Sequence, residues 1–245
     1  DLTGNDTDVD SGTDLEIGSI DTTGTQGSVT INGDSDSVTY DAGTAFDSLA
    51  AGETATDTFT YTVTDGDGGT DTATVTVTIT GENDLPIANN DTGSVTENGS
   101  TSIDLTGNDT DVDSGTDLEI GSIDTTGTQG SVTINGDSDS VTYDAGTAFD
   151  SLAAGQTATD TFTYTVTDGD GGTDTATVTV TITGENDLPT AVADSASVTE
   201  NGTTSIDLTG NDTDVDSGTD LEISGVNTSG IQGSVTINGD SDSVT

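Results

Sequence analysis

Residues 72–80 read TATVTVTIT, an unbroken alternation of threonines and apolar residues. Successive side chains of a β-strand point to opposite faces of the sheet, so this period of two predicts a strand with one apolar face. Residues 57–65, DTFTYTVTD, alternate in the same way, and the glycine-rich stretch 65–69, DGDGG, joins the two runs. Together they predict a β-hairpin whose apolar face is turned inward.

A second hairpin is predicted upstream. Asn32-Gly33 separates SVTI from DSDSVTY, and Asn-Gly between two strand-like runs is a strong short-range hairpin signal. No segment has the 3.6-residue period of an amphipathic helix. Short alternating strands with glycine turns, within about 100 residues, are typical of a β-sandwich. The sequence therefore predicts an all-β chain.

The sequence repeats with a shift of 103 residues. Residues 1–86 match residues 104–189 at every position but one, where Glu53 corresponds to Gln156. The repeated sequence begins a third time at Asp207 and runs to Thr245, before the second half of the unit. A period of about 100 residues corresponds to one ordinary domain per repeat, which is too long for a solenoid unit.

The domain boundaries are expected at GENDLP, residues 81–86 and 184–189, which contain the two prolines of the chain. We predict a repeat lacking its first strand at 1–84, a complete repeat at 85–187, and a repeat truncated before its last strands at 188–245. These are called the first, second and third copy below.

Charge limits the possible partners. The chain has 47 Asp and Glu, and no Lys, Arg or His, which gives a formal charge of −47. Nucleic acid is excluded, because binding phosphates requires Lys or Arg, and an anionic membrane surface is disfavoured for the same reason. No apolar run approaches the ~18 residues of a membrane span, so direct membrane insertion is not expected. The expected partners are cations, and Ca²⁺ and Mg²⁺ are the ones that take oxygen ligands.

The predicted core is thin. Apolar residues make up 27% of the chain, aromatics 3%, and there is no cysteine. Low hydrophobicity with high net charge is typical of disordered linkers, but the strict alternation favours folded strands. Self-repulsion among the carboxylates opposes folding. We therefore expect a domain that is marginal alone and stabilised by cations that bind only its folded state.

The carboxylates cluster in NDTDVDSGTD, which occurs at 5–14, 108–117 and 211–220. An EF-hand loop beginning at Asp6 would need Gly at position 6 and Glu at position 12, but Ser11 and Ile17 stand there. Two interpretations remain: solvated turns, which commonly use Asp, Asn and Gly, and cation sites. For DGDGG both stay open, and for DSDS at 34–37 an exposed turn is favoured.

Four motifs follow one another in the second copy: VTEN at 95–98, DVDSG at 111–115, YTVTDGDGG at 164–172 and ENDLP at 185–189. Their order resembles that of a cadherin repeat, in the form of the bacterial cadherin-like or VCBS repeats of large surface adhesins. The resemblance covers the whole repeat unit. It implies tandem Greek-key β-sandwich (cadherin/Ig-like) domains in a linear array, with Ca²⁺ bound at each junction between domains.

The resemblance also implies the metal ligands. At the junction around Asp187 they are Glu97, Glu185, Asn186, Asp187, Asp214 and Asp216. At the junction around Asp84 they are Asn83, Asp84, Asp111 and Asp113. Cadherins carry an acidic LDRE-type motif where this chain has LAAGE (49–53) or LAAGQ (152–156), so we expect one or two ions per junction.

An enzyme is not expected, because the usual general bases and nucleophiles His, Cys and Lys are missing. Near-identical copies favour a generic role, so the first hypothesis is a Ca²⁺-stiffened spacer of a secreted or cell-surface bacterial adhesin or matrix fibre. Its partners would be the neighbouring repeats of the same chain. The alternative is a subunit of a self-assembling extracellular filament, in which other copies associate laterally or by strand exchange along threonine-rich edges such as 70–82.

Overall fold

The computed structural model describes residues 1–10 and 12–245, and it confirms the all-β prediction. Among these residues the only helix is a short 3₁₀ turn, Thr3–Asn5. No helix in the described part of the chain is long and apolar enough to cross a membrane. The strands are well defined in the first and second copies, whereas the third copy has only β13 (Ile206–Asp207) and β14 (Ser243–Val244).

The chain divides into two compact units. Unit 1 comprises Asp1–Ala88, Asn108–Gly121 and Thr165–Thr175, and unit 2 comprises Asn89–Gly107, Ser122–Tyr164 and Ala176–Thr245. The division falls within the second copy, so that β8, β11 and β12 contribute residues to both units. The linker at 81–86 and the residues that it contacts therefore lie in unit 1. The linker at 184–189 and the residues that it contacts lie in unit 2.

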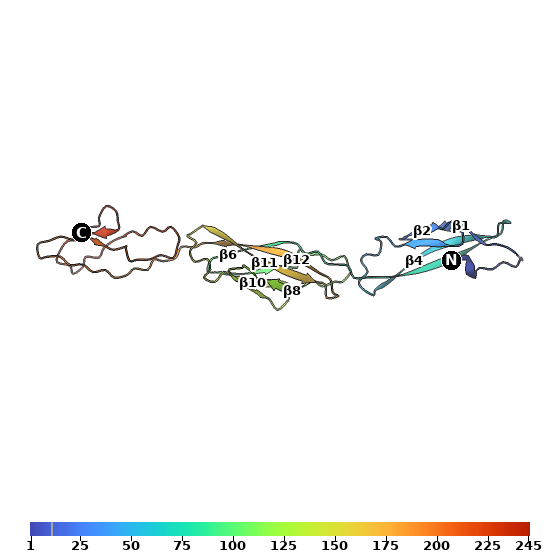
Figure 1. Ribbon diagram of the computed structural model, residues 1–245, viewed down its shortest axis with the longest axis horizontal. Helices are drawn as coiled ribbons and strands as arrows, with labels where there is room; N and C mark the ends of the chain where they lie inside the picture. Colours follow the sequence, from blue (N-terminus) through green and yellow to red (C-terminus); the bar gives the residue numbers. More distant parts are fainter. Residues whose placement is uncertain (11) are drawn as a thin grey trace. The chain divides into compact units, whose positions relative to one another are not determined.

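In unit 1 the first copy forms a three-stranded sheet in the order β1-β4-β5 (Figure 1). Its strands are β1 (Glu16–Asp21), β4 (Thr54–Thr64) and β5 (Thr70–Thr80). β4 and β5 pair antiparallel from Thr54↔Thr80 to Thr64↔Thr70, which confirms the predicted hairpin. In the turn between them, Asp65 Oδ1 accepts hydrogen bonds of 2.8 Å from the N–H groups of Asp67 and Gly69.

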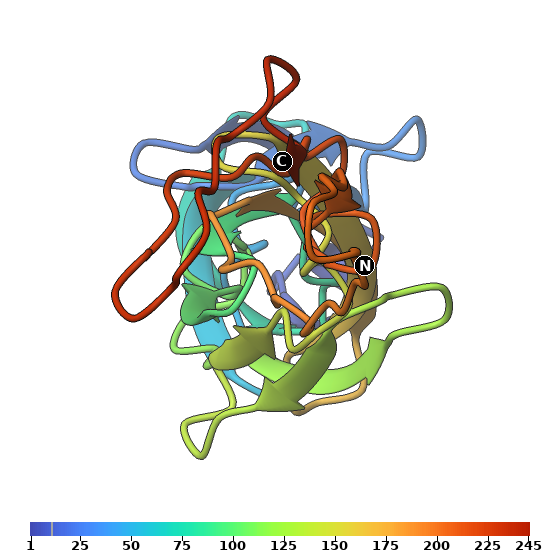
Figure 2. The same cartoon turned by 90° about the vertical axis from the view of Figure 1, so that its left-hand side faces the viewer.

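The second predicted hairpin is also present, but its turn differs from the expected Asn-Gly turn. β2 (Ser28–Ile31) pairs antiparallel with β3 (Val38–Asp41). The residue with left-handed backbone is Ser35, at φ 61°, and not Gly33. The loop between the strands spans residues 32–37 and is longer than a two-residue turn. The Asn32 side chain bridges it, donating to Ser37 Oγ and accepting from Thr39 Oγ1, both at 2.9 Å. The strand-connecting loops project from the strands in the turned view (Figure 2).

The second copy forms two sheets, in the orders β6-β12-β11-β8 and β7-β10-β9. β6 pairs in parallel with β12, and β7 pairs antiparallel with β10, so consecutive strands enter different sheets. The strands are β6 (Asp91–Thr96), β7 (Ser100–Asp104), β8 (Glu119–Asp124), β9 (Ser131–Ile134), β10 (Ser140–Asp144), β11 (Thr157–Thr167) and β12 (Thr173–Thr183).

The core of unit 2 contains the inward-facing residues of these strands. Val178, Val180 and Ile182 of β12 are fully buried, with 0% exposure. Tyr164 of β11 is also buried, and its hydroxyl donates to the carbonyl oxygen of Leu105 at 2.9 Å. The threonines between the apolar residues of β12 lie on the opposite face, as the alternation predicts.

A buried carboxylate ties this core to a loop. Asp160 of β11 is 4% exposed, and its Oδ2 accepts from Gln129 N and Gly130 N at 2.9 Å and from the Tyr143 hydroxyl at 2.7 Å. Burial raises the pKa of Asp160, but these hydrogen bonds outweigh it and hold the pKa below its ordinary value of 3.8. The same contacts surround Asp57 in the first copy.

Replacing this carboxylate with an amide tests its contribution. Asp160→Asn should lower the free energy of unfolding at neutral pH by about 1.5–3 kcal/mol, the usual range for hydrogen bonds to a charged group. Since the folded-state pKa is depressed, the contribution is full above about pH 4 and is lost as the pH falls through the folded-state value. Urea unfolding at pH 7 and pH 3 should show a difference that shrinks on acidification. Asp170→Asn, at an exposed turn position, is the charge-matched control, and an equal loss in both variants would contradict the prediction.

Candidate metal centre

Three carboxylates converge beside the linker that follows the second copy. One ligand oxygen each from Glu97, Asp187 and Asp216 lies within 4.8 Å of the others. Glu97 directly follows β6 and is 0% exposed, Asp187 belongs to the linker, and Asp216 belongs to the third copy and is 7% exposed. All three lie in unit 2. Segments far apart in sequence therefore place like charges in one small volume.

Backbone N–H groups hold two of these carboxylates in place. Glu97 Oε1 accepts from Glu185 N at 2.7 Å, and Asp216 Oδ2 accepts from Asp187 N at 3.1 Å. The second oxygens, Glu97 Oε2 and Asp216 Oδ1, are buried and have no hydrogen-bond partner. A buried charged oxygen without a partner is costly, so this site fits a bound cation, which would satisfy these oxygens.

The electrostatics of Asp187 agree with that fit. Burial raises the pKa of Asp187 above its ordinary value, and nearby carboxylates raise it further, namely Asp216, Asp150, Asp214 and Glu185. Asp214 also accepts the N–H of Asp216 at 2.8 Å, which shapes the DVDSG turn. Because the chain has no Lys, Arg or His, a cation that neutralises this cluster must come from outside the protein.

A similar cluster surrounds the linker after the first copy, within unit 1. Asp84 N donates to Asp113 Oδ2 at 2.9 Å, and Asp113 N donates to Asp111 Oδ1 at 2.8 Å. Asp113 Oδ1 and Asp111 Oδ2 are buried and have no hydrogen-bond partner. Burial raises the pKa of Asp84 above its ordinary value. The negative charges of nearby carboxylates raise it further, namely Asp113, Asp47, Asp111 and Glu82.

Three carboxylates at these clusters were not predicted from the sequence: Asp47 and Glu82 at the first linker and Asp150 at the second. Asp150 raises the pKa of Asp187, and its Oδ1 is buried without a hydrogen-bond partner. Asp47 and Asp150 occupy equivalent positions, two residues before the LAAGE and LAAGQ stretches. An aspartate just outside LAAGE or LAAGQ could have indicated this ligand. The comparison with the LDRE-type motif led us to expect the acidic pair inside the stretch instead.

The two predicted asparagine ligands donate hydrogen bonds through their amide nitrogens. Asn186 Nδ2 donates to the carbonyl oxygen of Asp187. Asn83 Nδ2 donates to the carbonyl oxygen of Asp84 at 2.7 Å and to Asp168 Oδ2 at 2.8 Å. Asp168 lies in the DGDGG turn, where its Oδ1 accepts the N–H groups of Asp170, Gly171 and Gly172. In this structure Asp168 therefore serves as a turn residue that also anchors the linker.

The single sequence difference between residues 1–86 and 104–189, Glu53 against Gln156, lies where each copy contacts the following one. Glu53 Oε2 accepts from the Ser114 hydroxyl at 3.1 Å, and Gln156 Oε1 accepts from the Ser217 hydroxyl at 3.2 Å. Ser114 N and Ser217 N donate to the carbonyl oxygens of Ser48 and Ser151, both at 2.9 Å. The exchange of Glu for Gln thus preserves the hydrogen bond to the following copy while it removes one charge.

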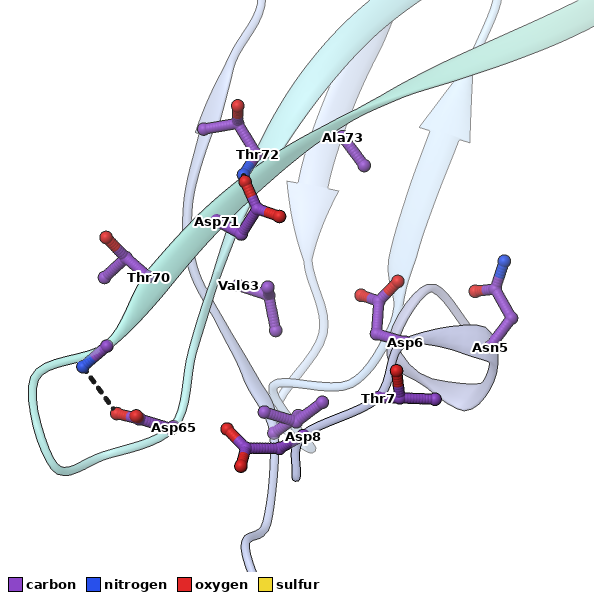
Figure 3. A pocket seen from close by; sticks show the side chains of 12 residues that line it. Asn5, Asp6, Thr7, Asp8, Val63, Asp65, Thr70, Asp71, Thr72 and Ala73 are labelled. Atoms are coloured by element: carbon purple, nitrogen blue, oxygen red, sulfur yellow. Dashed lines mark hydrogen bonds between the residues drawn. The ribbon is translucent and has the colours of Figure 1, made fainter. Parts of the chain in front are cut away.

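The first copy has in addition an acidic pocket of about 410 Å³, shown in Figure 3. Four of its lining residues are aspartates: Asp6, Asp8, Asp65 and Asp71. Its apolar lining includes Val63 and Ala73, from the β4–β5 hairpin. The pocket therefore lies along the hairpin and beside the first NDTDVDSGTD stretch.

Comparison with known proteins identifies the repeat. Residues 1–81 and 83–184 match the family model of the bacterial cadherin-like domain, and residues 186–245 match that of a bacterial Ig domain. The chain belongs to the bacterial cadherin-like domain family. The resemblance stated from the four motifs is thereby confirmed, while the narrower VCBS type remains a prediction.

Solved structures similar to this bacterial cadherin-like chain are animal cadherins. Mouse cadherin-23 EC22-24 has 18% sequence identity and a TM-score of 0.58, over 97% of this chain and 77% of that one. Drosophila N-cadherin EC1-4 has 16% identity and a TM-score of 0.41, over 76% of this chain, which spans 45% of that one. At such identities the similarity shows the fold alone. No curated protein matches the chain.

Removing one charge from the cluster tests its electrostatics without any metal. A raised folded-state pKa means that ionised Asp187 costs stability as the pH rises above its unfolded value of about 3.8. Asp187→Asn should therefore raise the melting temperature in chelator at pH 7 and low salt, with no gain at pH 3. The gain should shrink with added NaCl, because salt screens the repulsion.

Asp137→Asn is the matched control with the opposite sign. Hydrogen bonds from Asp139 N and Ser140 lower the pKa of the exposed Asp137, so its replacement should lower the melting temperature slightly under the same conditions. A lower melting temperature for Asp187→Asn in chelator would contradict the assignment of repulsion at Asp187.

Proposed function

We propose that this chain is a spacer segment of an extracellular bacterial adhesin or matrix fibre. Its repeats, at 1–84, 85–187 and 188–245, are joined by linkers that bound Ca²⁺ stiffens. The observation that carries the proposal is the convergence of Glu97, Asp187 and Asp216, from the second copy, the linker and the third copy, with oxygens within 4.8 Å of one another. A cation held by all three would join these segments.

Ca²⁺ suits the donor set better than other cations do. It takes 6–8 oxygen ligands in flexible geometry, whereas Mg²⁺ demands a near-ideal octahedron and keeps several waters. The proposed ligands at the second linker are Glu97, Asp187 and Asp216, with Asp150, Asp214, Glu185 and Asn186 around them, for one or two ions. At the first linker they are Asp84, Asp111 and Asp113, with Asp47 and Asn83.

Weak sites are sufficient for this role. Extracellular modules bind Ca²⁺ with dissociation constants of about 10⁻⁴–10⁻³ M. A free Ca²⁺ concentration ten times the dissociation constant adds about 1.4 kcal/mol per site to the stability of the folded state. That amount is useful to repeats whose charge opposes folding, and it is lost where Ca²⁺ is scarce.

The spacer role is supported by the repetition itself. Residues 1–86 and 104–189 differ at one position, so neither sequence carries a recognition motif that the other lacks. Bacterial cadherin-like domains are structural and adhesive, and they are typical of extracellular surface proteins. The chain also lacks His, Cys and Lys, which enzymes most often use as bases and nucleophiles.

Glu97→Gln tests the metal and the electrostatics together, because the expected effect changes sign. In chelator the variant should melt at a higher temperature than the unmodified chain, since a buried carboxylate oxygen without a partner is removed. In millimolar Ca²⁺ it should melt at a lower temperature, because an anionic ligand is lost and the dissociation constant rises about tenfold. Melting curves with and without Ca²⁺, at constant ionic strength, measure both.

Glu119→Gln is the matched control, since Glu119 is exposed on β8 and lies outside the proposed ligands. It should leave the Ca²⁺-dependent shift unchanged. Small-angle scattering of the unmodified chain should show a narrower spread of dimensions in Ca²⁺ than in chelator. Identical melts and identical scattering in Ca²⁺ and chelator would refute the Ca²⁺-stiffened spacer.

A further inference from the structure

The first strand of the second copy lies beside its last strand and runs in the same direction. β6 pairs in parallel with β12, from Asp91↔Val178 to Thr96↔Thr183. All of these paired residues belong to unit 2. The strand by which the chain enters this copy and the strand by which it leaves are therefore direct neighbours.

The direction of the two strands decides how tension acts on them. In a parallel pair, the start of one strand and the end of the other lie at opposite ends of the ladder. A pull on the chain before β6 and after β12 therefore draws the two strands along their own axes in opposite directions. The hydrogen bonds of the ladder then share the load in shear, whereas a pull on two adjacent ends would open them one at a time.

Side chains and backbone extend this ladder at both of its ends. At its start, Thr177 N donates to Asn90 Oδ1 at 2.8 Å. At its end, Glu97 N donates to the carbonyl oxygen of Thr183 at 3.0 Å, and Glu185 N donates to Glu97 Oε1 at 2.7 Å. The contact between the first and the last strand thus continues on both sides of the paired residues.

The ladder is also backed by the core. Val178, Val180 and Ile182 of β12 are 0% exposed. Gly93 of β6 lies so close to the core that a Cβ there would collide with Ile103 Cδ1, and Ile103 itself is 6% exposed. Separating β6 from β12 would therefore expose buried apolar surface to water while the hydrogen bonds break. The ladder and the core would fail together.

We propose that the second copy bears tension, and that the β6–β12 ladder with its tied ends is the element that resists a pull along the chain. Rupture of this ladder limits unfolding under load, because the chain enters and leaves the copy through these two strands. This role goes beyond that of a spacer. A spacer sets a length, whereas this ladder sets the tension that the length can transmit.

A bound cation would add to this resistance. Asp187 follows β12 in the linker, and one of its oxygens lies within 4.8 Å of an oxygen of Glu97, at the end of β6. A cation held by both would pass the load from the linker straight to β6, so that residues 98–186 would carry no tension while it stayed bound. This clause alone rests on the proposed function.

Force spectroscopy with two attachment geometries tests the ladder, since the chain contains no cysteine. Leu85 and Leu188 are 67% and 85% exposed at the two boundaries of the second copy, so Leu85→Cys with Leu188→Cys loads the ladder in shear. Asn98 is exposed in the turn after β6, so Asn98→Cys with Leu188→Cys pulls the ladder open from one end. In chelator and NaCl, the first geometry should need at least about three times the force of the second, because sheared hydrogen bonds act together.

The unfolding steps give a second readout, which applies in Ca²⁺ as well as in chelator. In the shear geometry the copy should unfold in one step of about 350 Å, the extended length of the chain between the two attachments. A short first step at low force that frees β6 alone, followed by a longer step at higher force, would overturn the proposal. Equal rupture forces in the two geometries in chelator would also overturn it.

Glu97→Gln separates the ladder from the metal clause. The amide keeps an oxygen that can accept from Glu185 N, so in chelator and shear its rupture force should be no lower than that of the chain with the attachment cysteines alone. Ca²⁺ should raise the rupture force of that chain and leave the Glu97→Gln variant unchanged. A rupture force that depends on geometry but is indifferent to Ca²⁺ supports the ladder and overturns the metal clause.

Discussion

The whole structure is constrained by negative charge that the chain cannot neutralise. With no Lys, Arg or His, each carboxylate must be satisfied by hydrogen-bond donors, by water or by a cation from outside. Most acidic residues in turns use the backbone, as Asp168 does with three N–H groups. The carboxylates at the linkers differ, because several keep a buried oxygen without a hydrogen-bond partner. The strands form a scaffold, and the linkers concentrate the remaining charge.

The second constraint is that a sheet must be completed at its edges. The same sequence places fully buried valines and isoleucine, Val178, Val180 and Ile182, in β12 of the second copy and half-buried ones, Val75, Val77 and Ile79, in β5 of the first. The difference arises outside these strands, in the residues that pair with them. Burial in this chain is therefore a property of neighbouring segments as much as of each strand's own alternation, and the core of a copy depends on strands that precede its hairpins.

Much of the fold could be predicted from local pattern. The alternation at 72–80 lies within β5, and DGDGG joins β4 to β5, because side-chain direction in a strand follows sequence directly. The candidate metal site could be predicted from the sequence only in part. Motif order placed Glu97, Asp187 and Asp216 in one set, but Asp150 was missed because loop convergence has no sequence period. Both asparagines donate through their amide nitrogens, which the motifs did not predict, because an amide can donate as well as accept.

The Glu53 and Gln156 contacts suggest how a repetitive protein can vary without losing its contact geometry. Both side chains accept a hydrogen bond from a serine hydroxyl of the following copy, at 3.1 and 3.2 Å. Exchanging one oxygen for an NH₂ group changes the charge beside a linker by one and leaves that contact in place. If cations stiffen the linkers as proposed, successive linkers in a series of otherwise identical repeats can differ in their demand for cations, and such a chain would loosen stepwise as the cation concentration falls.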